Sequence, residues 1–414
     1  MWTIVHQLCT VVHMTTRTLH RPTAIERRAR IAVAALFLTN GALAANLAPR
    51  FPDLKAAFEL DNTAFGLAMA TWPAGAVTAG LASAFLIRRF GSAYTATIGT
   101  AFTALCYFVA VIAPSPIALG AILFVGGAVD TITDTAQNAH GLRIQRRYGR
   151  SIINSFHALW SVGAITGGLM AAGAIALDLS LGVHFGIVAA LFATMGLAAL
   201  PYCLRGPDRD GAPEDDAAQQ SDEEQPKSRF NARTALTLAA VGIFAFGGIL
   251  MEGTSMSWST LYLADELHAP AAIAASGYIA MVSAQFLARL AGDRLVDRFG
   301  QRTVARAGGL LAAVGMGAAL AFPNVAGTIV GFTLVGLGVA TLVPAARQTA
   351  DSLPGLRPGT GLTALGWLMN LSFLVSPPII GAVADAASLR AGLLAIPVAG
   401  VLVAVFAGVL QRKR

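Results

Sequence analysis

Twelve apolar runs, each long enough to cross a lipid bilayer, dominate this sequence. A membrane helix needs about 20 mostly apolar residues, each adding 1.5 Å to its length. Only 12% of the residues are charged, whereas soluble domains carry roughly 25%, so a water-facing fold of this size would lack polar surface. The sequence therefore predicts an all-α polytopic membrane protein. The expected spans are 31–49, 63–87, 93–112, 116–142, 152–177, 182–204, 234–263, 270–292, 303–322, 325–346, 359–383 and 390–411.

The longest break between these runs, residues 205–233, is acidic and almost free of apolar side chains. Such a segment cannot bury enough surface to fold alone, so we expect a disordered cytoplasmic linker. It divides the chain into an N-terminal six-helix bundle, 31–204, and a C-terminal six-helix bundle, 234–411. Residues 1–30 are expected to form a cytoplasmic N-terminal segment. Within it, residues 1–13 lack the basic region and cleavage site of a secretory signal and are interpreted as an over-extended gene start.

The distribution of lysine and arginine predicts how the chain is oriented. With both termini in the cytoplasm, the exterior loops contain only Arg50, Lys55 and Arg390, and the other 26 of the 29 basic residues (29 minus 3) lie on the cytoplasmic side. Cytoplasmic loops of membrane proteins carry this excess of positive charge. We therefore predict a multi-pass protein of the cell inner membrane with both termini cytoplasmic.

The two halves of the chain carry related sequence. Arg89-Phe90-Gly91 and Arg298-Phe299-Gly300 lie 209 residues apart, and Gly126–Ala136 aligns with Gly336–Ala346 at an offset of 210. These segments fall in the second and eighth spans and in the fourth and tenth. A parallel six-helix repeat of this kind is the architecture of the major facilitator superfamily.

The segment from Asp293 to Arg302 resembles the signature loop between the second and third helices of each half in that superfamily. It departs from the signature where Asp293 replaces the leading glycine, and the first copy has Arg88 in place of the usual aspartate. The resemblance covers about Arg27 to Arg412. It implies a secondary transporter that moves a small solute by alternating access.

Two shorter segments, Asp130 to Ser161 and Glu252 to Trp258, look like the YbjJ-type subgroup of bacterial inner-membrane members.

The superfamily resemblance also implies a gating role for residues at the ends of the second and eighth spans, where ion pairs and helix dipoles can hold the halves together. The predicted gating residues are Arg89, Asp293, Asp297, Arg298 and Arg302.

Glycine and proline clusters mark two further helices. Gly163 to Gly168 in the fifth span keeps the glycines of an antiporter signature but lacks its proline. Its counterpart in the eleventh span contains Pro377 and Pro378. We expect these helices to kink or to pack closely against their neighbours at these points.

The acidic residues inside the spans are the main candidates for chemistry. Asp130, Asp134 and Asn138 follow one another at i, i+4 and i+8, so they form one stripe along the fourth helix. Glu252 lies in the seventh span beside Gly253, which could open that helix locally and expose its backbone to a ligand. A charged side chain facing lipid costs roughly 2.5–3.5 kcal/mol, so we expect these groups to face a cavity between the halves.

These polar groups permit three interpretations. A carboxyl group can load and release protons as access alternates, with His157 as a possible relay. The stripe can instead bind solute, together with Asn138, Asn154 and His157, while Trp258 stacks on it. The third interpretation is structural, in which a carboxylate caps a helix or pairs with Arg143 or Arg146.

Several classes of protein are not supported by the sequence. It contains no phosphate-binding Gly-Lys-Ser/Thr loop, no His-Glu-x-x-His and no Cys-x-x-Cys, so we expect no ATP-driven pump, enzyme, metal site or cofactor. The net charge of +7 sits in clusters between apolar runs, which indicates membrane orientation and not nucleic-acid binding.

The expected partners are a small solute, protons and the lipid bilayer, with the chain acting as a monomer. The predicted function is secondary active transport, proton-coupled, of a polar metabolite such as a sugar or organic acid. Proton-driven efflux of hydrophobic drugs or metabolites is the alternative within the same class. A non-transporting receptor on a transporter scaffold is the alternative from another class.

Overall fold

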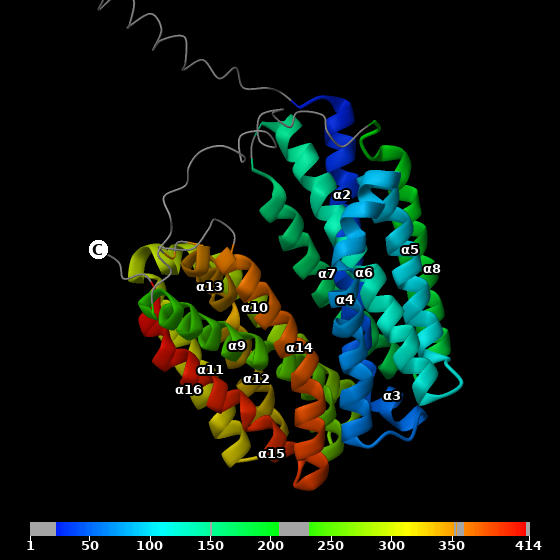
Figure 1. The fold of residues 1–414 in the computed structure, drawn as a ribbon. Helices are drawn as coiled ribbons and strands as arrows, with labels where there is room; N and C mark the ends of the chain where they lie inside the picture. The colour runs from blue at the N-terminus through cyan, green and yellow to red at the C-terminus, as the bar shows by residue number, and fades with distance from the viewer. Residues whose placement is uncertain (1–21, 150, 207–231, 352, 354–359, 411–414) are drawn as a thin grey trace, which may run out of the picture.

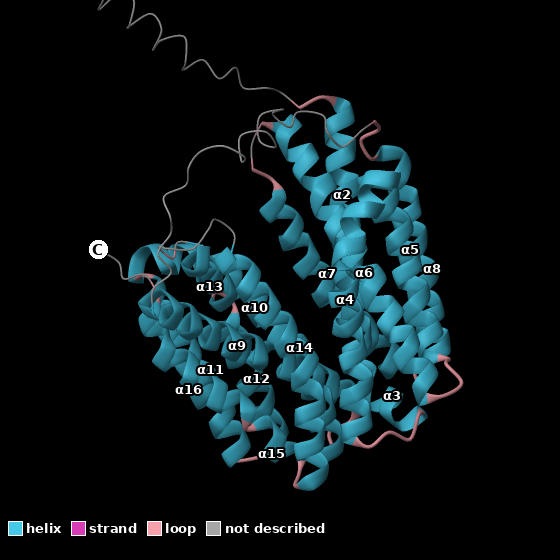
Figure 2. Cartoon of the chain, in the orientation of Figure 1, coloured by secondary structure: helices cyan, strands magenta, loops and turns pink. Residues whose placement is uncertain are grey.

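The computed structural model describes residues 22–149, 151–206, 232–351, 353 and 360–410. These residues form helices joined by short loops, with no strand among them (Figure 2). Among the described residues, eleven helices are long and apolar enough to cross a membrane, and the bent helix at 62–90 brings the number to twelve. The predicted all-α membrane architecture is confirmed. The predicted linker and the predicted N-terminal segment lie for the most part outside the described residues.

The helices coincide with the predicted spans to within a few residues at most ends. The N-terminal half contains α2 (Ala24–Leu47), η1 (Ala48–Arg50), α3 (Phe51–Ala57), α4 (Asn62–Phe90), α5 (Ser92–Val111), α6 (Pro116–Tyr148), α7 (Ile153–Ala176), α8 (Leu181–Ala199) and η2 (Leu200–Tyr202). The C-terminal half contains α9 (Ala232–Leu261), η3 (Tyr262–Glu266), α10 (Ala271–Phe299), α11 (Gln301–Ala321), α12 (Val325–Val339), α13 (Leu342–Asp351), α14 (Thr360–Ala386), α15 (Leu389–Leu393), α16 (Ala395–Phe406) and η4 (Ala407–Val409).

The two halves lie side by side and spread apart toward the end of the molecule at which α2 begins (Figure 1). We call this the terminal end. At the opposite end, α4 of the first half and α14 of the second run together, and we call this the gate end. The halves are also joined along α7 and α10.

The sequence repeat is also a repeat of backbone conformation. Gly91 and Gly300 end α4 and α10 with φ/ψ of 85°/153° and 80°/149°. The turns before these two helices each contain a non-glycine residue in the left-handed region, Glu59 at φ 51° and His268 at φ 50°, again 209 positions apart (268 minus 59). Because left-handed conformations are strained for such side chains, their recurrence supports two copies of one structural unit.

The glycines of α7 allow it to approach α2 closely, as the sequence led us to expect. A Cβ atom at Gly163 would lie 2.0 Å from the carbonyl oxygen of Leu38, and one at Gly167 would lie 2.3 Å from that of Ala42. In a lipid bilayer the hydrophobic effect does not drive helices together, so the close packing that small residues permit stabilises such contacts instead. In the eleventh span, α14 continues through Pro377, whose carbonyl oxygen would be 2.3 Å from a Cβ at Gly66.

Gly163→Ala is expected to destabilise the protein by about 1–3 kcal/mol because the added methyl group meets a rigid backbone carbonyl. Gly173→Ala is the matched control, since it lies on the same helix and a Cβ there would have no neighbour within 4 Å. Thermal unfolding of the purified variants in detergent measures the difference. Equal melting temperatures for the two variants would contradict the packing explanation.

Candidate functional site

A cavity of about 350 Å³ lies between the two halves. Its wall combines residues of α2, α4, α5 and α6 with residues of α9 and α14. The lining is mostly apolar and aromatic, and it includes Trp72, Tyr107 and Phe373. The serine and asparagine side chains in the wall are Ser257, Asn370 and Ser376. The volume is at the lower end of the range for small-molecule pockets, about 300–1,000 Å³.

Asp130 lies on α6, two turns along the helix from the cavity-lining Leu123, in a short chain of hydrogen bonds. The Asn40 amide donates to Asp130 Oδ1 at 2.8 Å, and the Trp160 indole N–H donates to Asn40 Oδ1 at 2.8 Å. The Asp130 carboxylate also interacts electrostatically with Tyr107, a residue of the cavity wall. The expected position of Asp130 facing the cavity between the halves stays a prediction. Its partner Asn40 was not predicted because neutral residues in apolar runs give no signal.

The rest of the α6 stripe continues toward the terminal end. The Asn138 amide donates to Asp134 Oδ1 at 3.1 Å, which confirms that the two residues share one face. His157 on α7 interacts electrostatically with Asp134 and with Arg289 and Arg347 of the other half. Asn154, one turn before His157, is exposed.

The structural interpretation allowed Arg143 to pair with Asp134, but the structure gives Arg143 other partners. Its guanidinium donates to the carbonyl oxygens of Leu204, Arg205 and Gly206, at 3.3, 2.8 and 3.2 Å. It therefore caps the chain where the N-terminal half ends. This assignment leaves the acidic stripe without Arg143 as a neutralising partner.

Glu252 is held by residues of its own half. Its carboxylate accepts a hydrogen bond from Gln285 at 2.8 Å, and Arg289 lies 3.6 Å away. The predicted local opening at Gly253 is wrong, because α9 is continuous from Ala232 to Leu261. Gly253 instead packs against the ring of Phe373, where a Cβ would be 3.2 Å from the ring carbons.

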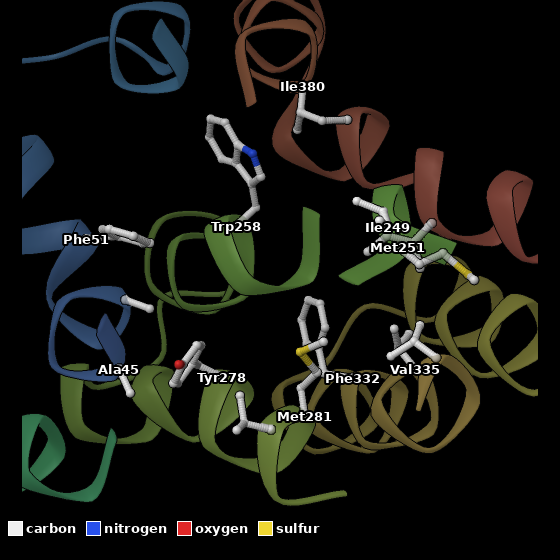
Figure 3. Packing of buried hydrophobic residues seen from close by; sticks show 14 of the residues in the cluster. Ala45, Phe51, Ile249, Met251, Trp258, Tyr278, Met281, Phe332, Val335 and Ile380 are labelled. Carbon is white, nitrogen blue, oxygen red and sulfur yellow. The ribbon is translucent and has the colours of Figure 1, made fainter. Parts of the chain in front are cut away.

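The structure places Trp258 inside the hydrophobic core, and the side chain is not part of the cavity wall. Its side chain is fully buried, and its ring meets Phe65 of the other half edge-on at 5.4 Å between centroids. Figure 3 shows its indole among core residues of α9 and its neighbours. Among the tryptophans of the described residues, Trp72 is the one that lines this cavity.

The predicted gating residues lie at the terminal end of the molecule, on α4, α10 and α11. Arg89 and Arg298 each lie over the adjacent phenylalanine ring, at 5.6 and 5.4 Å from its centroid, so the two copies of the motif adopt the same local geometry. Arg302 donates to the carbonyl oxygens of Gly408 and Leu410, which ties α11 to the end of the last helix. Asp293 and Asp297 are exposed on the last turns of α10.

Contacts at the gate end join the halves through polar groups that the sequence did not identify. Asp385, at the end of α14, accepts hydrogen bonds from the backbone N–H and the side-chain amide of Asn62, at 3.0 and 2.8 Å. It also accepts from the backbone N–H and hydroxyl of Thr63, at 2.7 and 2.6 Å. Lys55 and Asp265 form an ion pair of 2.9 Å across the same end. Asp385 thus caps the first turn of a helix in the opposite half.

No group of three or more histidine, cysteine, aspartate or glutamate residues that could hold a metal ion occurs in the described part of the chain. The polar groups near the cavity are instead carboxylates, amides and guanidinium groups. The carboxylates can bind and release protons, and all three kinds of group can make hydrogen bonds to a solute.

Comparison with known proteins identifies the family to which this architecture belongs. The sequence profile of the Major Facilitator Superfamily matches residues 33–294 and 243–414. The chain belongs to this superfamily, as its repeat and signature loop indicated, and it is a multi-pass membrane transporter.

Its relatives include the transporter y4wD of Sinorhizobium fredii, 29% identical over 92% of this chain and 97% of that protein. An MFS-type transporter of Yersinia pestis is 28% identical over 83% of this chain and 85% of that protein. The membrane protein MosC of Rhizobium meliloti is 37% identical over 43% of this chain and 44% of its own length.

Solved structures share the fold at low sequence identity. A point mutant of the nucleoside transporter NupG matches with a TM-score of 0.72 at 14% identity, covering 94% of this chain and all of that one (100%). A D-xylose–proton symporter matches with a TM-score of 0.71 at 14% identity, over 91% of this chain and 96% of the symporter. These likenesses confirm the two-bundle fold.

Proposed function

We propose that the protein is a proton-coupled secondary active transporter that works by alternating access. The observation that carries this proposal is the environment of Asp130. Its carboxylate is on α6, two turns from the cavity-lining Leu123, and is hydrogen-bonded by the neutral Asn40, with no basic partner in the described part of the chain. Because no fixed positive charge balances it, either a proton or a solute group must do so when water is excluded.

The contacts at the gate end support alternating access. Asp385 with Asn62 and Lys55 with Asp265 hold the halves together there, while the halves spread apart toward the terminal end (Figure 1). A rocking motion that breaks these contacts would expose the cavity to the other side of the membrane. The latch predicted from the sequence would act in the opposite phase of this cycle, when the terminal end closes. Its residues are Arg89, Asp293, Asp297, Arg298 and Arg302.

We further propose that the gate end faces the exterior and that the termini lie in the cytoplasm of a bacterial cell, in its inner membrane. The three basic residues assigned to exterior loops support this, since Arg50, Lys55 and Arg390 all contact chain segments at the gate end. A membrane-impermeant maleimide should therefore label Glu59→Cys in intact cells. Labelling that requires permeabilised cells would reverse the orientation.

Transport and coupling are tested on the purified protein. A thermal-shift screen against sugars, organic acids, amino acids and organic cations first finds a ligand, because a ligand of the folded state raises its apparent stability. Proteoliposomes then report accumulation of that ligand under an imposed pH gradient. We expect accumulation that a protonophore abolishes. Accumulation unaffected by the protonophore would contradict proton coupling, and binding without any flux would favour the receptor alternative.

A further inference from the structure

The wall of the cavity points to the chemical class of the solute. Trp72 and Tyr107 stack at 4.8 Å between ring centroids, with their planes 25° apart, and both line the cavity. Tyr107 is buried and Trp72 is half-buried. Because the rings stack face to face, the half-buried Trp72 forms an aromatic surface on the N-terminal side with Tyr107 packed against it, and Phe373 of α14 contributes a third ring to the same cavity.

The backbone of α6 fixes this aromatic surface. A Cβ atom at Gly126 would lie 2.6 Å from Trp72 Cζ3, and one at Gly127 would lie 2.0 Å from the Trp72 carbonyl oxygen. Two adjacent glycines therefore make the space in which Trp72 sits. A ring held in this way can stack on a ligand at little conformational cost.

The polar groups of the wall are too few for a polyhydroxylated solute. A free sugar carries a hydroxyl group on nearly every carbon, whereas the wall offers the side chains of Ser257, Asn370 and Ser376 besides the tyrosine hydroxyl and the indole N–H. Each hydroxyl buried without a partner costs about 1–3 kcal/mol. The cavity thus favours an apolar or aromatic body over a sugar ring.

The helix geometry relates this cavity to Asp130. Leu123, which lines the cavity, and Asp130 are seven residues apart on α6, so they share one face of the helix and lie about 10 Å apart along its axis. Ala44 of α2 lines the cavity, and Asn40, which holds Asp130, lies one turn before it. A molecule seated on the aromatic surface would reach the carboxylate with a polar group on a short chain.

We infer that the solute is an amphipathic molecule with an apolar ring that stacks on Trp72 and a positively charged head that pairs with Asp130. The head is cationic because the carboxylate has a neutral protein partner, Asn40, and the bound charge takes the place of the proton. This inference rests on the proposed function for the role of Asp130 in coupling. It replaces the sugar or organic acid expected from the α6 stripe.

The inference is tested by equilibrium binding to the purified full-length protein without any proton gradient. The probes share one ring and one chain length and differ in the head: 4-phenylbutylamine, 4-phenylbutanol and 4-phenylbutanoate, with glucose as the polyol. We expect the amine to bind most tightly, the alcohol more weakly, and glucose not at all. Tighter binding of glucose or of 4-phenylbutanoate than of the amine would overturn the inference, as would failure of every phenyl probe to bind.

Variants separate the two parts of the site. Trp72→Ala should weaken amine binding by about tenfold or more, and Trp72→Phe should restore most of it. Asp130→Asn should weaken the amine by about tenfold while leaving the alcohol unchanged. Trp367→Ala, which removes an exposed tryptophan of α14 that does not line the cavity, is the control for general loss of aromatic surface.

These measurements distinguish an error in the inferred solute class from an error in the proposed proton-coupled transport. Accumulation of another solute under a pH gradient, with no binding of the phenyl series, would refute the solute class and leave proton-coupled transport intact. Amine binding that Trp72→Ala does not reduce would refute the aromatic seat whatever the flux measurements show.

Discussion

Asp130→Asn is expected to abolish accumulation of solute driven by a pH gradient while still permitting exchange of solute across the membrane, at solute concentrations high enough to offset its weaker binding. An asparagine can keep a hydrogen bond to Asn40, which now donates at 2.8 Å, so the local packing survives. It cannot bind and release a proton, so the cycle of the carrier is no longer linked to the gradient. In proteoliposomes at zero membrane potential, the internal concentration of solute should rise only to the external one.

Glu252→Gln is the informative comparison for this prediction. Glu252 is the other candidate carboxylate, but it already has Arg289 at 3.6 Å and a hydrogen bond from Gln285. We therefore expect Glu252→Gln to slow transport by loosening α9 from α10 and to retain accumulation. The reverse pattern, with coupling lost in Glu252→Gln and kept in Asp130→Asn, would assign the proton to Glu252.

The sequence predicted the helices well because the signal that defines them is local. Twenty apolar residues in a row define a span whatever surrounds it, and the limits of α5 and α7 differ from the prediction by one residue at each end. The i, i+4, i+8 spacing likewise placed Asp130, Asp134 and Asn138 on one face of α6 without knowledge of its neighbours.

The sequence could not predict which side of an apolar helix meets the cavity. In a membrane helix that is apolar on all sides, periodicity no longer distinguishes the buried face from the exposed one. For this reason Trp258 was assigned to ligand stacking, whereas it is fully buried and Trp72 lines the cavity. Arg289, inside the predicted eighth span, was overlooked although a charge at that depth is itself a signal.

Contacts between the halves were the least accessible from the sequence, since they join residues far apart in the chain. Asp385 and Asn62 are 323 positions apart, and neither residue belongs to a motif. An aspartate just beyond the predicted end of the eleventh span reads as an ordinary loop residue. Only the packing of α14 against α4 reveals that it caps a helix of the other half.

Asp385→Ala is expected to open the gate end and shift the protein toward the state that is accessible from that side. The carboxylate accepts four hydrogen bonds from Asn62 and Thr63, and it sits at the positive end of the α4 dipole. Because the group is exposed, the electrostatic part is screened by solvent. We expect the ratio of closed to open gate to fall by roughly tenfold, which corresponds to about 1.4 kcal/mol.

The rate at which a cysteine in the cavity wall reacts with an impermeant maleimide, added at the gate end, measures this shift. Ser257→Cys, in a chain whose native cysteines are serine, supplies the probe because Ser257 lines the cavity. Asp61→Ala is a close control: Asp61 caps the same helix, accepting from the Ala64 N–H at 2.7 Å, but from within its own half. Faster labelling in Asp385→Ala than in Asp61→Ala would establish that the cross-half cap holds the gate, since both variants weaken the start of α4 and only one releases α14. Equal labelling in the two would mean that Asp385 only stabilises a helix end. The gate would then be held by backbone packing, since a Cβ at Gly66 would lie 2.3 Å from the Pro377 carbonyl oxygen and one at Gly381 would lie 2.2 Å from that of Asn62.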